Sequence, residues 1–166
     1  MNSPVLFYGA TRLNGHFSNF AFYNITIDEF VFFCNEQYVI YAKAMLFGDV
    51  DVARLITKSK SPIEIKKLGR KVRGFNQKKW DDNVNDIADA CNLAKFTQHA
   101  HLKELLLATG KAPIAEASVY DRIWGIGVDV EEGKDMSKWR GQNLLGKSLM
   151  RVREILSCDE DISQPI

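Results

Sequence analysis

The spacing of apolar residues along the chain predicts a few short strands. Residues 4–8 form an apolar run, and residues 22–33 hold two apolar, β-branched runs on either side of Asp28 and Glu29. These patterns are typical of a strand and of a hairpin. A further candidate strand covers residues 112–118. The strands are too few and too short for a large sheet.

From residue 35 onward the apolar period becomes helical. With Asn35 as the expected N-cap, the first helix should run to about Phe47. The same period predicts further helices over residues 49–57, 62–70, 82–99, 101–108 and 142–156. In the long helix over 82–99, we expect Lys95 at the edge of an apolar stripe. The pattern therefore predicts an α+β fold that is mostly helical, with a small β-sheet.

Length and composition are those of one globular domain. The chain has 166 residues, of which 46% are apolar and 26% charged, and no low-complexity linker divides it. We expect a single domain over residues 1–157 and a flexible acidic tail over residues 158–166. The sequence has neither a signal-peptide pattern nor an apolar run of about 18 residues. The expected location is therefore cytoplasmic, while the oligomeric state is not indicated.

Cysteine and histidine spacing does not indicate a metal site. The three cysteines are an odd number without CxxC spacing, which argues against a disulfide framework or a zinc site. His99 and His101 are two positions apart in a helical segment and should point in different directions. We therefore expect no metal and no cofactor.

Charge is distributed unevenly along the chain. The net charge is only +1, but residues 54–79 contain ten basic residues and one acidic residue, so this segment carries +9. Such asymmetry favours an anionic partner, such as phosphate or nucleic acid. A solvated helical face would produce the same pattern, and charge alone does not decide between the two.

A carboxylate and an amine fall on one face of the helix that begins at residue 35. Glu36 and Lys43 are seven positions apart, which places them about two turns (~10 Å) apart beside Ile40 and Phe47. Glu36 also lies in the first turn, where the helix dipole stabilises a negative charge. A pair of this kind beside apolar groups suits acid–base or nucleophilic catalysis. Two ordinary surface charges are the alternative.

Two loops carry residues suited to binding a planar, polar ligand. The first is FSNF at residues 17–20, where short hydrogen-bonding side chains lie between two phenylalanines, although a simple turn is equally consistent with it. The second runs over residues 116–127 and contains Asp121 and the WGIG motif. Here tryptophan could stack on a base, glycine amides could approach phosphate, and the aspartate could accept from ribose hydroxyls. A tight turn with a core tryptophan is the alternative for this loop.

Taken in order, these motifs resemble those of the NADAR family, also called YbiA-like and named for a predicted link to NAD and ADP-ribose metabolism. The matching stretches are FSNF at 17–20, Glu36 to Lys43-Ala44, Gly69-Arg70, Trp80, Lys95-Phe96, LLLATG at 105–110, Asp121 with WGIG at 124–127, GQNLLG at 141–146 and LM at 149–150. They span about residues 7–156, which is nearly the whole chain.

The resemblance implies a compact, mainly helical glycosidase that hydrolyses N-glycosidic bonds, with Glu36, Lys43 and Asp121 as catalytic residues. The candidate substrate-binding residues in the matched motifs are Phe17, Ser18, Asn19, Arg70, Trp80, Trp124, Gly125, Gly127 and Asn143. Gln37 and Ala42 depart from the histidine and glutamine that are common in the family, which puts the substrate more in doubt than the chemistry.

Two substrate classes are associated with the family. One activity removes ADP-ribose from the guanine base of nucleic acid, and the other cleaves a phosphoribosylamino-pyrimidine intermediate of riboflavin synthesis. The basic segment over residues 54–79 favours the first, with DNA or RNA as the carrier. A non-catalytic module that binds ADP-ribose or nucleic acid is the remaining alternative.

Overall fold

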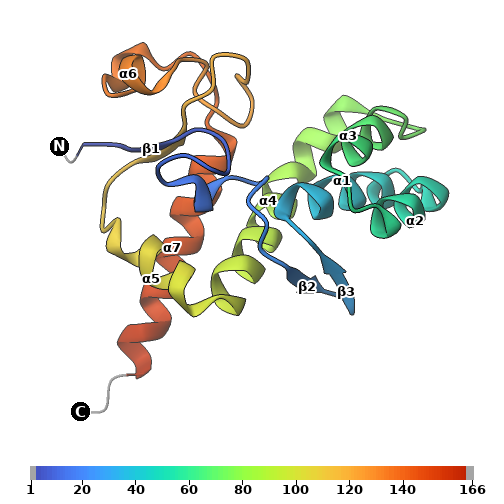
Figure 1. The fold of residues 1–166 in the computed structure, drawn as a ribbon, viewed down its shortest axis with the longest axis horizontal. Coiled ribbons are helices and arrows are strands. Elements are labelled where there is room, and N and C mark those ends of the chain that lie inside the picture. Colours follow the sequence, from blue (N-terminus) through green and yellow to red (C-terminus); the bar gives the residue numbers. More distant parts are fainter. Residues whose placement is uncertain (1–2, 164–166) are drawn as a thin grey trace. The chain divides into compact units, whose positions relative to one another are not determined.

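The computed structural model describes the backbone of residues 3–163 and the side chains of residues 3–158. It confirms a mixed α+β fold in which helices dominate and the strands are short (Figure 1). The chain divides into two compact units, and each is described by itself. The first unit combines residues 1–18 with residues 96–166, and the second covers residues 19–95.

The first unit is built around two parallel strands and a long helix. Strand β1 (Val5–Phe7) pairs with β4 (Ile114–Glu116). Helix α7 (Leu144–Ser163) packs against both β4 and α5 (Ala100–Ala108), as Figure 1 shows for the two helices. The shorter elements of this unit are η1 (Gly15–Phe17), α6 (Val130–Gly133) and η2 (Met136–Lys138).

Helix α7 supplies much of the core of the first unit. Leu145, Leu149, Val152 and Leu156 follow each other at helical spacing, and each is at most 2% exposed. Burying an aliphatic side chain of this size stabilises the fold by about 1.5–3 kcal/mol. Arg153 is also buried on this helix, because its Nη1 donates to the Ala112 carbonyl over 2.8 Å.

The second unit joins a hairpin to a cluster of helices. Strands β2 (Ile25–Ile27) and β3 (Phe30–Phe32) are antiparallel, and both turn residues between them have positive φ, as a type I′ turn requires. The helices are α1 (Asn35–Leu46), α2 (Val50–Lys58), α3 (Pro62–Arg70) and α4 (Gln77–Gln98). Helix α1 packs against α2 and α3 through a core of Ile40, Ala44, Ala53, Ile56 and Ile65.

Several predicted boundaries were wrong by a few residues. The N-cap of α1 is Cys34 rather than Asn35, whose side chain instead donates to the Asn92 side chain over 2.8 Å. Helix α4 begins five residues earlier than predicted, because the Asn76 side chain caps it by accepting from the Lys79 amide. Short polar segments of this kind lack the apolar period on which the prediction depended.

The end of the chain also differs from the predicted boundary. Helix α7 continues to Ser163, so residues 158–163 of the expected tail are helical. Residues 164–166 lie outside the described part of the chain, and the flexible tail stays a prediction. The short helix α6 and the 3-10 turns were not anticipated, since each covers only three or four residues.

Candidate active site

Glu36 lies in the first turn of α1, close to two buried thiols. It is half-buried, and its backbone N–H donates to the Asn19 carbonyl over 2.9 Å. Burial is the main cause that raises the pKa of Cys34 to about 11, and the Glu36 carboxylate adds to this effect. Burial likewise raises the pKa of Cys91, and Glu36 again adds to it. The Glu36 carboxylate therefore lies near Cys34, at the start of α1, and near Cys91 on α4.

Lys95, on α4, acts electrostatically on the same two thiols. Its side chain is 0% exposed, like those of Ala88 and Cys91 in the same predicted stripe. Its Nζ lies 5.3 Å from the centroid of the Tyr23 ring. Burial lowers the pKa of Lys95 to about 8. At pH 7 roughly a tenth of this amine is then neutral, about 300 times the fraction for an ordinary lysine.

The charges of Glu36 and Lys95 have opposite effects on Cys34 and Cys91. The Glu36 carboxylate raises the pKa of each thiol, and the Lys95 cation lowers it. A carboxylate and a buried amine thus share one environment in the second unit. The spacing of Ala88, Cys91 and Lys95 in the sequence indicates that the three side chains share one helix face. In the structure all three are fully buried.

Lys43 has a different environment, at the end of α3. Its Nζ donates to the Gly69 carbonyl over 3.1 Å and lies 4.7 Å from the centroid of the Phe75 ring. The Trp80 ring centroid is 5.9 Å from the same nitrogen. Desolvation lowers the pKa of Lys43, and the half-buried amine is stabilised by these two aromatic faces.

Gly69 makes this arrangement possible. A Cβ at this position would lie 2.9 Å from Cγ2 of Ile40, so α3 can approach α1 this closely only with glycine here. The close approach brings the Gly69 carbonyl to Lys43. Arg70 follows directly, with an exposed side chain.

Asp121 organises the loop that carries the WGIG motif in the first unit. Its Oδ1 accepts from the backbone N–H groups of Ile123 and Trp124, over 2.9 and 2.8 Å. A Cβ on Gly125 would lie 2.8 Å from the Glu116 carbonyl oxygen, and Gly127 has φ +70°. Close packing and backbone conformation are therefore sufficient reasons for both glycines, which are buried. Binding of a ligand by the glycine amides stays a prediction.

Asn143 joins this loop to β4 and the start of α7. It is buried with φ 53°, and its Nδ2 donates to the Ile114 carbonyl over 2.9 Å. Its backbone N–H donates to the Gly125 carbonyl over 3.1 Å, and Leu145 N–H donates to that of Trp124. Among the described residues, no hydrogen-bond partner is found for the buried Asn143 Oδ1. Trp124 itself is half-buried.

The FSNF motif contains residues in two kinds of environment. Phe17 is 1% exposed, and its ring packs against those of Phe7 and Phe96 at centroid distances of 5.9 and 6.0 Å, so it is a core residue of the first unit. Ser18 and Asn19 are buried as well. Asn19 Oδ1 is a second buried oxygen for which the described residues supply no hydrogen-bond partner. An amide oxygen in this state is suited to accept from a ligand.

The structure thus forms three groups from the predicted site residues. Asn19 and Glu36 lie together with Lys95, Lys43 lies beside Trp80, and Asp121 holds the loop of Trp124. Within the described residues, no cluster of histidine, cysteine or carboxylate side chains could hold a metal ion. No helix in the same part of the chain is long and apolar enough to cross a membrane.

A family model for the NADAR domain matches residues 6–157. The chain belongs to the NADAR family. An N-glycosidase of Acanthamoeba polyphaga mimivirus, R617, is 45% identical to it over 72% of this chain and 71% of its own length. N-glycosidase YbiA of Escherichia coli is 32% identical over 93% and 89% of the two chains. The chain is accordingly an enzyme of the glycosidase class.

The fold agrees with that of a solved NADAR relative. The NMR structure of the E. coli protein YbiA superposes with a TM-score of 0.82 at 30% sequence identity, covering 100% of this chain and 92% of that one. A further relative, protein irg-1 of Caenorhabditis elegans, is 36% identical over 92% and 79% of the two chains.

Gln37 has a structural role in this chain. Its Nε2 donates to the carbonyls of Ile56 and Ser59, over 2.8 and 3.1 Å, and its Oε1 accepts from Phe33 N–H. These bonds join α1 to the end of α2 and to β3, and the side chain is 1% exposed. The Gln37 side chain therefore holds elements of the second unit together.

Proposed function

We propose that this NADAR glycosidase removes ADP-ribose from the guanine base of nucleic acid. The observation that carries the proposal is an exposed basic surface in the unit that also contains Glu36 and Lys43. All ten basic residues between positions 54 and 79 are exposed. They are Arg54, Lys58, Lys60, Lys66, Lys67, Arg70, Lys71, Arg73, Lys78 and Lys79.

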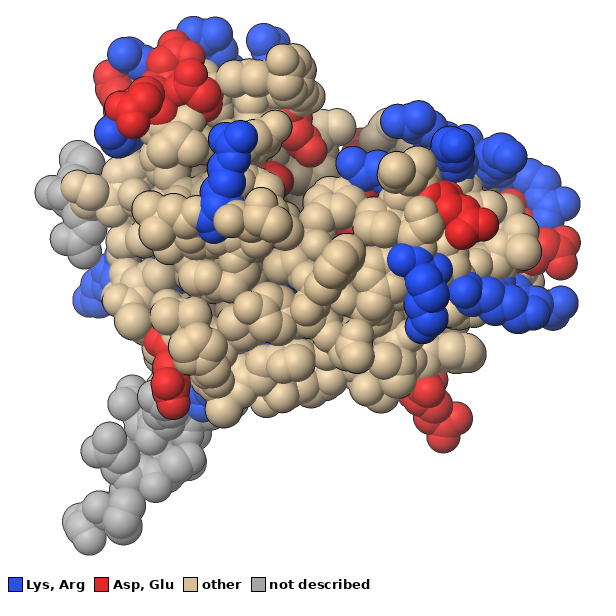
Figure 2. Space-filling view, viewed as in Figure 1, with Lys and Arg blue, Asp and Glu red and all other residues tan. Residues whose placement is uncertain are grey.

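Figure 2 shows lysine and arginine side chains gathered over the part of the second unit formed by α2 and α3. Some of their charge is compensated, since Arg73 pairs with Asp49 and Asp51, and Lys78 with Asp82. A concentration of exposed lysine and arginine attracts phosphates and favours a polyanionic substrate over a small monophosphate.

The chemistry that we assign follows from the charge that develops in the reaction. Departure of the base from C1 of ribose builds oxocarbenium character, which a nearby carboxylate stabilises. The departing nitrogen must also be protonated. We assign the acid–base role to Glu36. Asp121 is assigned to the ribose hydroxyls or to the developing positive charge.

Lys43 is assigned a covalent role. A neutral amine can attack C1 of ribose and displace the amino group of guanine, which leaves with a proton; opening of the ribose ring then leaves C1 joined to the lysine as an imine, which water hydrolyses. The lowered pKa of Lys43, caused by desolvation, supports this role. Lys95 meets the same requirement, since burial lowers its pKa to about 8. Two amines in the second unit are therefore candidates.

The decisive experiment is incubation with an oligonucleotide that carries ADP-ribosylated guanine, with mass analysis for free ADP-ribose. The phosphoribosylamino-pyrimidine intermediate of riboflavin synthesis is tested in parallel. Glu36→Gln should lower turnover by about 10²- to 10⁴-fold if Glu36 is the general acid or base. Glu104→Gln, at an exposed position of α5, is the matched control. Turnover of the pyrimidine alone would refute the substrate assignment, and full activity of Glu36→Gln would refute the role of Glu36.

The imine is tested separately by adding borohydride during turnover. Reduction converts the C=N bond into a stable amine, and peptide mass mapping then identifies the modified lysine. We expect an adduct on Lys43. An adduct on Lys95 would transfer the role to that residue, whereas no adduct together with a fully active Lys43→Arg variant would exclude the imine on Lys43.

A further inference from the structure

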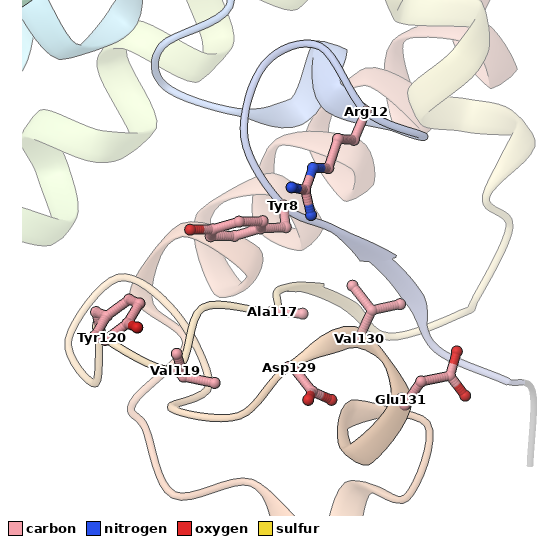
Figure 3. A pocket seen from close by; sticks show the side chains of 8 residues that line it. All are labelled: Tyr8, Arg12, Ala117, Val119, Tyr120, Asp129, Val130 and Glu131. Carbon is pink, nitrogen blue, oxygen red and sulfur yellow. The ribbon is translucent and has the colours of Figure 1, made fainter.

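A cavity lies at one edge of the parallel strand pair in the first unit. Strands β1 and β4 run in the same direction with Phe7 opposite Glu116, so both end at this edge. Tyr8 and Ala117, the residues that directly follow the two strands, line a cavity of about 350 Å³ (Figure 3). Ligands of open α/β sheets bind outside the carboxyl ends of parallel strands, which is the position of this cavity.

The walls of the cavity present two tyrosines and a guanidinium. The Arg12 guanidinium lies over the Tyr8 ring, with its carbon 5.1 Å from the ring centroid. Tyr120 comes from the loop after β4 and is 90% exposed, next to Val119, which is 44% exposed. Figure 3 shows Tyr8 and Arg12 on the segment that follows β1, and Tyr120 on the segment that follows β4. A tyrosine that leaves most of its surface in water is available to stack on a planar ring.

Two carboxylates line the opposite side, at the start of α6. Asp129 Oδ1 accepts from the Glu132 backbone N–H over 2.9 Å, and Glu131 pairs with Lys134 over 2.7 Å. Carboxylates repel phosphate but accept from hydroxyl and amino groups. The cavity is therefore divided, with a cation on the side of Arg12 and acceptors on the side of Asp129.

We propose that this strand-edge cavity binds a nucleotide. Its base lies against the tyrosines, its phosphate lies near Arg12, and its ribose hydroxyls face Asp129 and Glu131. The size fits one nucleoside, since small-molecule sites begin at about 300 Å³. The proposal rests on the proposed function, because that substrate offers two sources of such a nucleotide: the ADP part of ADP-ribose, and a neighbouring nucleotide of the strand.

The test measures binding by titration calorimetry on the full-length protein, without turnover. The probes are ADP, ribose 5-phosphate, which lacks a base, and a thymidine tetranucleotide. We expect Tyr120→Ala to weaken nucleotide binding by about 5- to 100-fold, which corresponds to the loss of one stacked base. Arg12→Gln should weaken it as well, and ribose 5-phosphate should bind less tightly than ADP by a similar factor. Phe22→Ala, at an exposed aromatic residue of the second unit, and Lys111→Gln are the matched controls.

The relative affinities of the two nucleotide probes identify the source. Tighter binding of ADP that depends on Tyr120 assigns the cavity to ADP-ribose, and tighter binding of the tetranucleotide that likewise depends on Tyr120 assigns it to the strand. Three results would overturn the proposal. In the first, ADP and ribose 5-phosphate bind equally; in the second, neither ADP nor the tetranucleotide binds. In the third, neither Tyr120→Ala nor Arg12→Gln changes the affinities.

The two proposals fail in different ways. If the proposed function is wrong, ADP-ribose is not released from guanine, yet nucleotide binding still depends on Tyr120. If the strand-edge cavity binds no nucleotide, ADP-ribose is released and Tyr120→Ala leaves the KM for the substrate unchanged.

Discussion

Replacing Lys95 by methionine tests whether burial lowers the pKa of this amine in the folded protein. Methionine keeps the length of the apolar stem and removes only the titrating group, so cavity formation should be small. The side chain of Lys95 is 0% exposed, and burial lowers its pKa from 10.5 to about 8. The folded state therefore binds the proton less tightly than the unfolded state.

The size and sign of the effect follow from this difference. A pKa lowered from 10.5 to about 8 corresponds to about 3 kcal/mol. Below pH 8 the lysine is protonated in both states, and the folded state carries the whole cost. Between pH 8 and 10.5 the unfolded state binds more protons, so the stability of the wild-type protein rises with pH relative to the variant. Above 10.5 the difference is constant.

The assay is urea denaturation of both proteins at several values between pH 7 and 10. The unfolding free energy of Lys95→Met minus that of wild type should fall by about 2–3 kcal/mol between pH 7 and pH 10. The reason is that the wild-type lysine loses its proton in the folded state over this range and then costs less to bury. Lys111→Met, at an exposed position of the first unit, should show no such change. A free-energy difference that stays flat from pH 7 to 10 would refute the lowered pKa of Lys95.

Three further variants test other parts of the structure. Arg73 holds the pKa of Asp49 well below its usual range. The stability that the Asp49 carboxylate contributes is therefore present above pH ~4 and is lost as the pH falls. Asp49→Asn should lower the thermal midpoint at pH 7, and less so at pH 3. Gly146→Ala should prevent folding, seen as loss of the cooperative transition in circular dichroism, because its Cβ would overlap the Ile114 carbonyl oxygen. Leu149→Ala should cost about 2–5 kcal/mol in urea denaturation; a cost below 1 kcal/mol would contradict the packing of α7.

The elements with an apolar period could be predicted from the sequence, and those without it could not. The hairpin over residues 22–33 and the helices over 49–57 and 62–70 were predicted within about three residues of where they lie. The start of α4 was missed because its first turns are polar and its only signal is the cap at Asn76. The short elements between β4 and α7 have no apolar period, and single side-chain bonds hold them, such as the bond from Trp139 Nε1 to the Gly133 carbonyl.

The site residues were predictable as a set, but their individual environments were not. Placing Glu36 and Lys43 on one helix follows from spacing alone. Their partners do not, because the Gly69 carbonyl that binds Lys43 is 26 residues away in sequence. Phe17 illustrates the opposite case, since a motif residue expected at a ligand lies in the core between Phe7 and Phe96.

The burial of Lys95 bears on function because it works against stability. A cost of about 3 kcal/mol at neutral pH is a large share of the 5–15 kcal/mol that separates folded from unfolded states in ordinary domains. An aliphatic residue would fill the same stripe of α4 without this cost. Groups with strongly shifted pKa values gather at sites that need a neutral amine or a carboxylic acid of raised pKa. Glu36 and Lys95 both influence the pKa of Cys34, so they lie in one environment. If Lys95→Met is more stable at pH 7 but inactive, with binding retained, the cost of the buried amine serves the reaction; if it is more stable and fully active, Lys95 has no part in the chemistry.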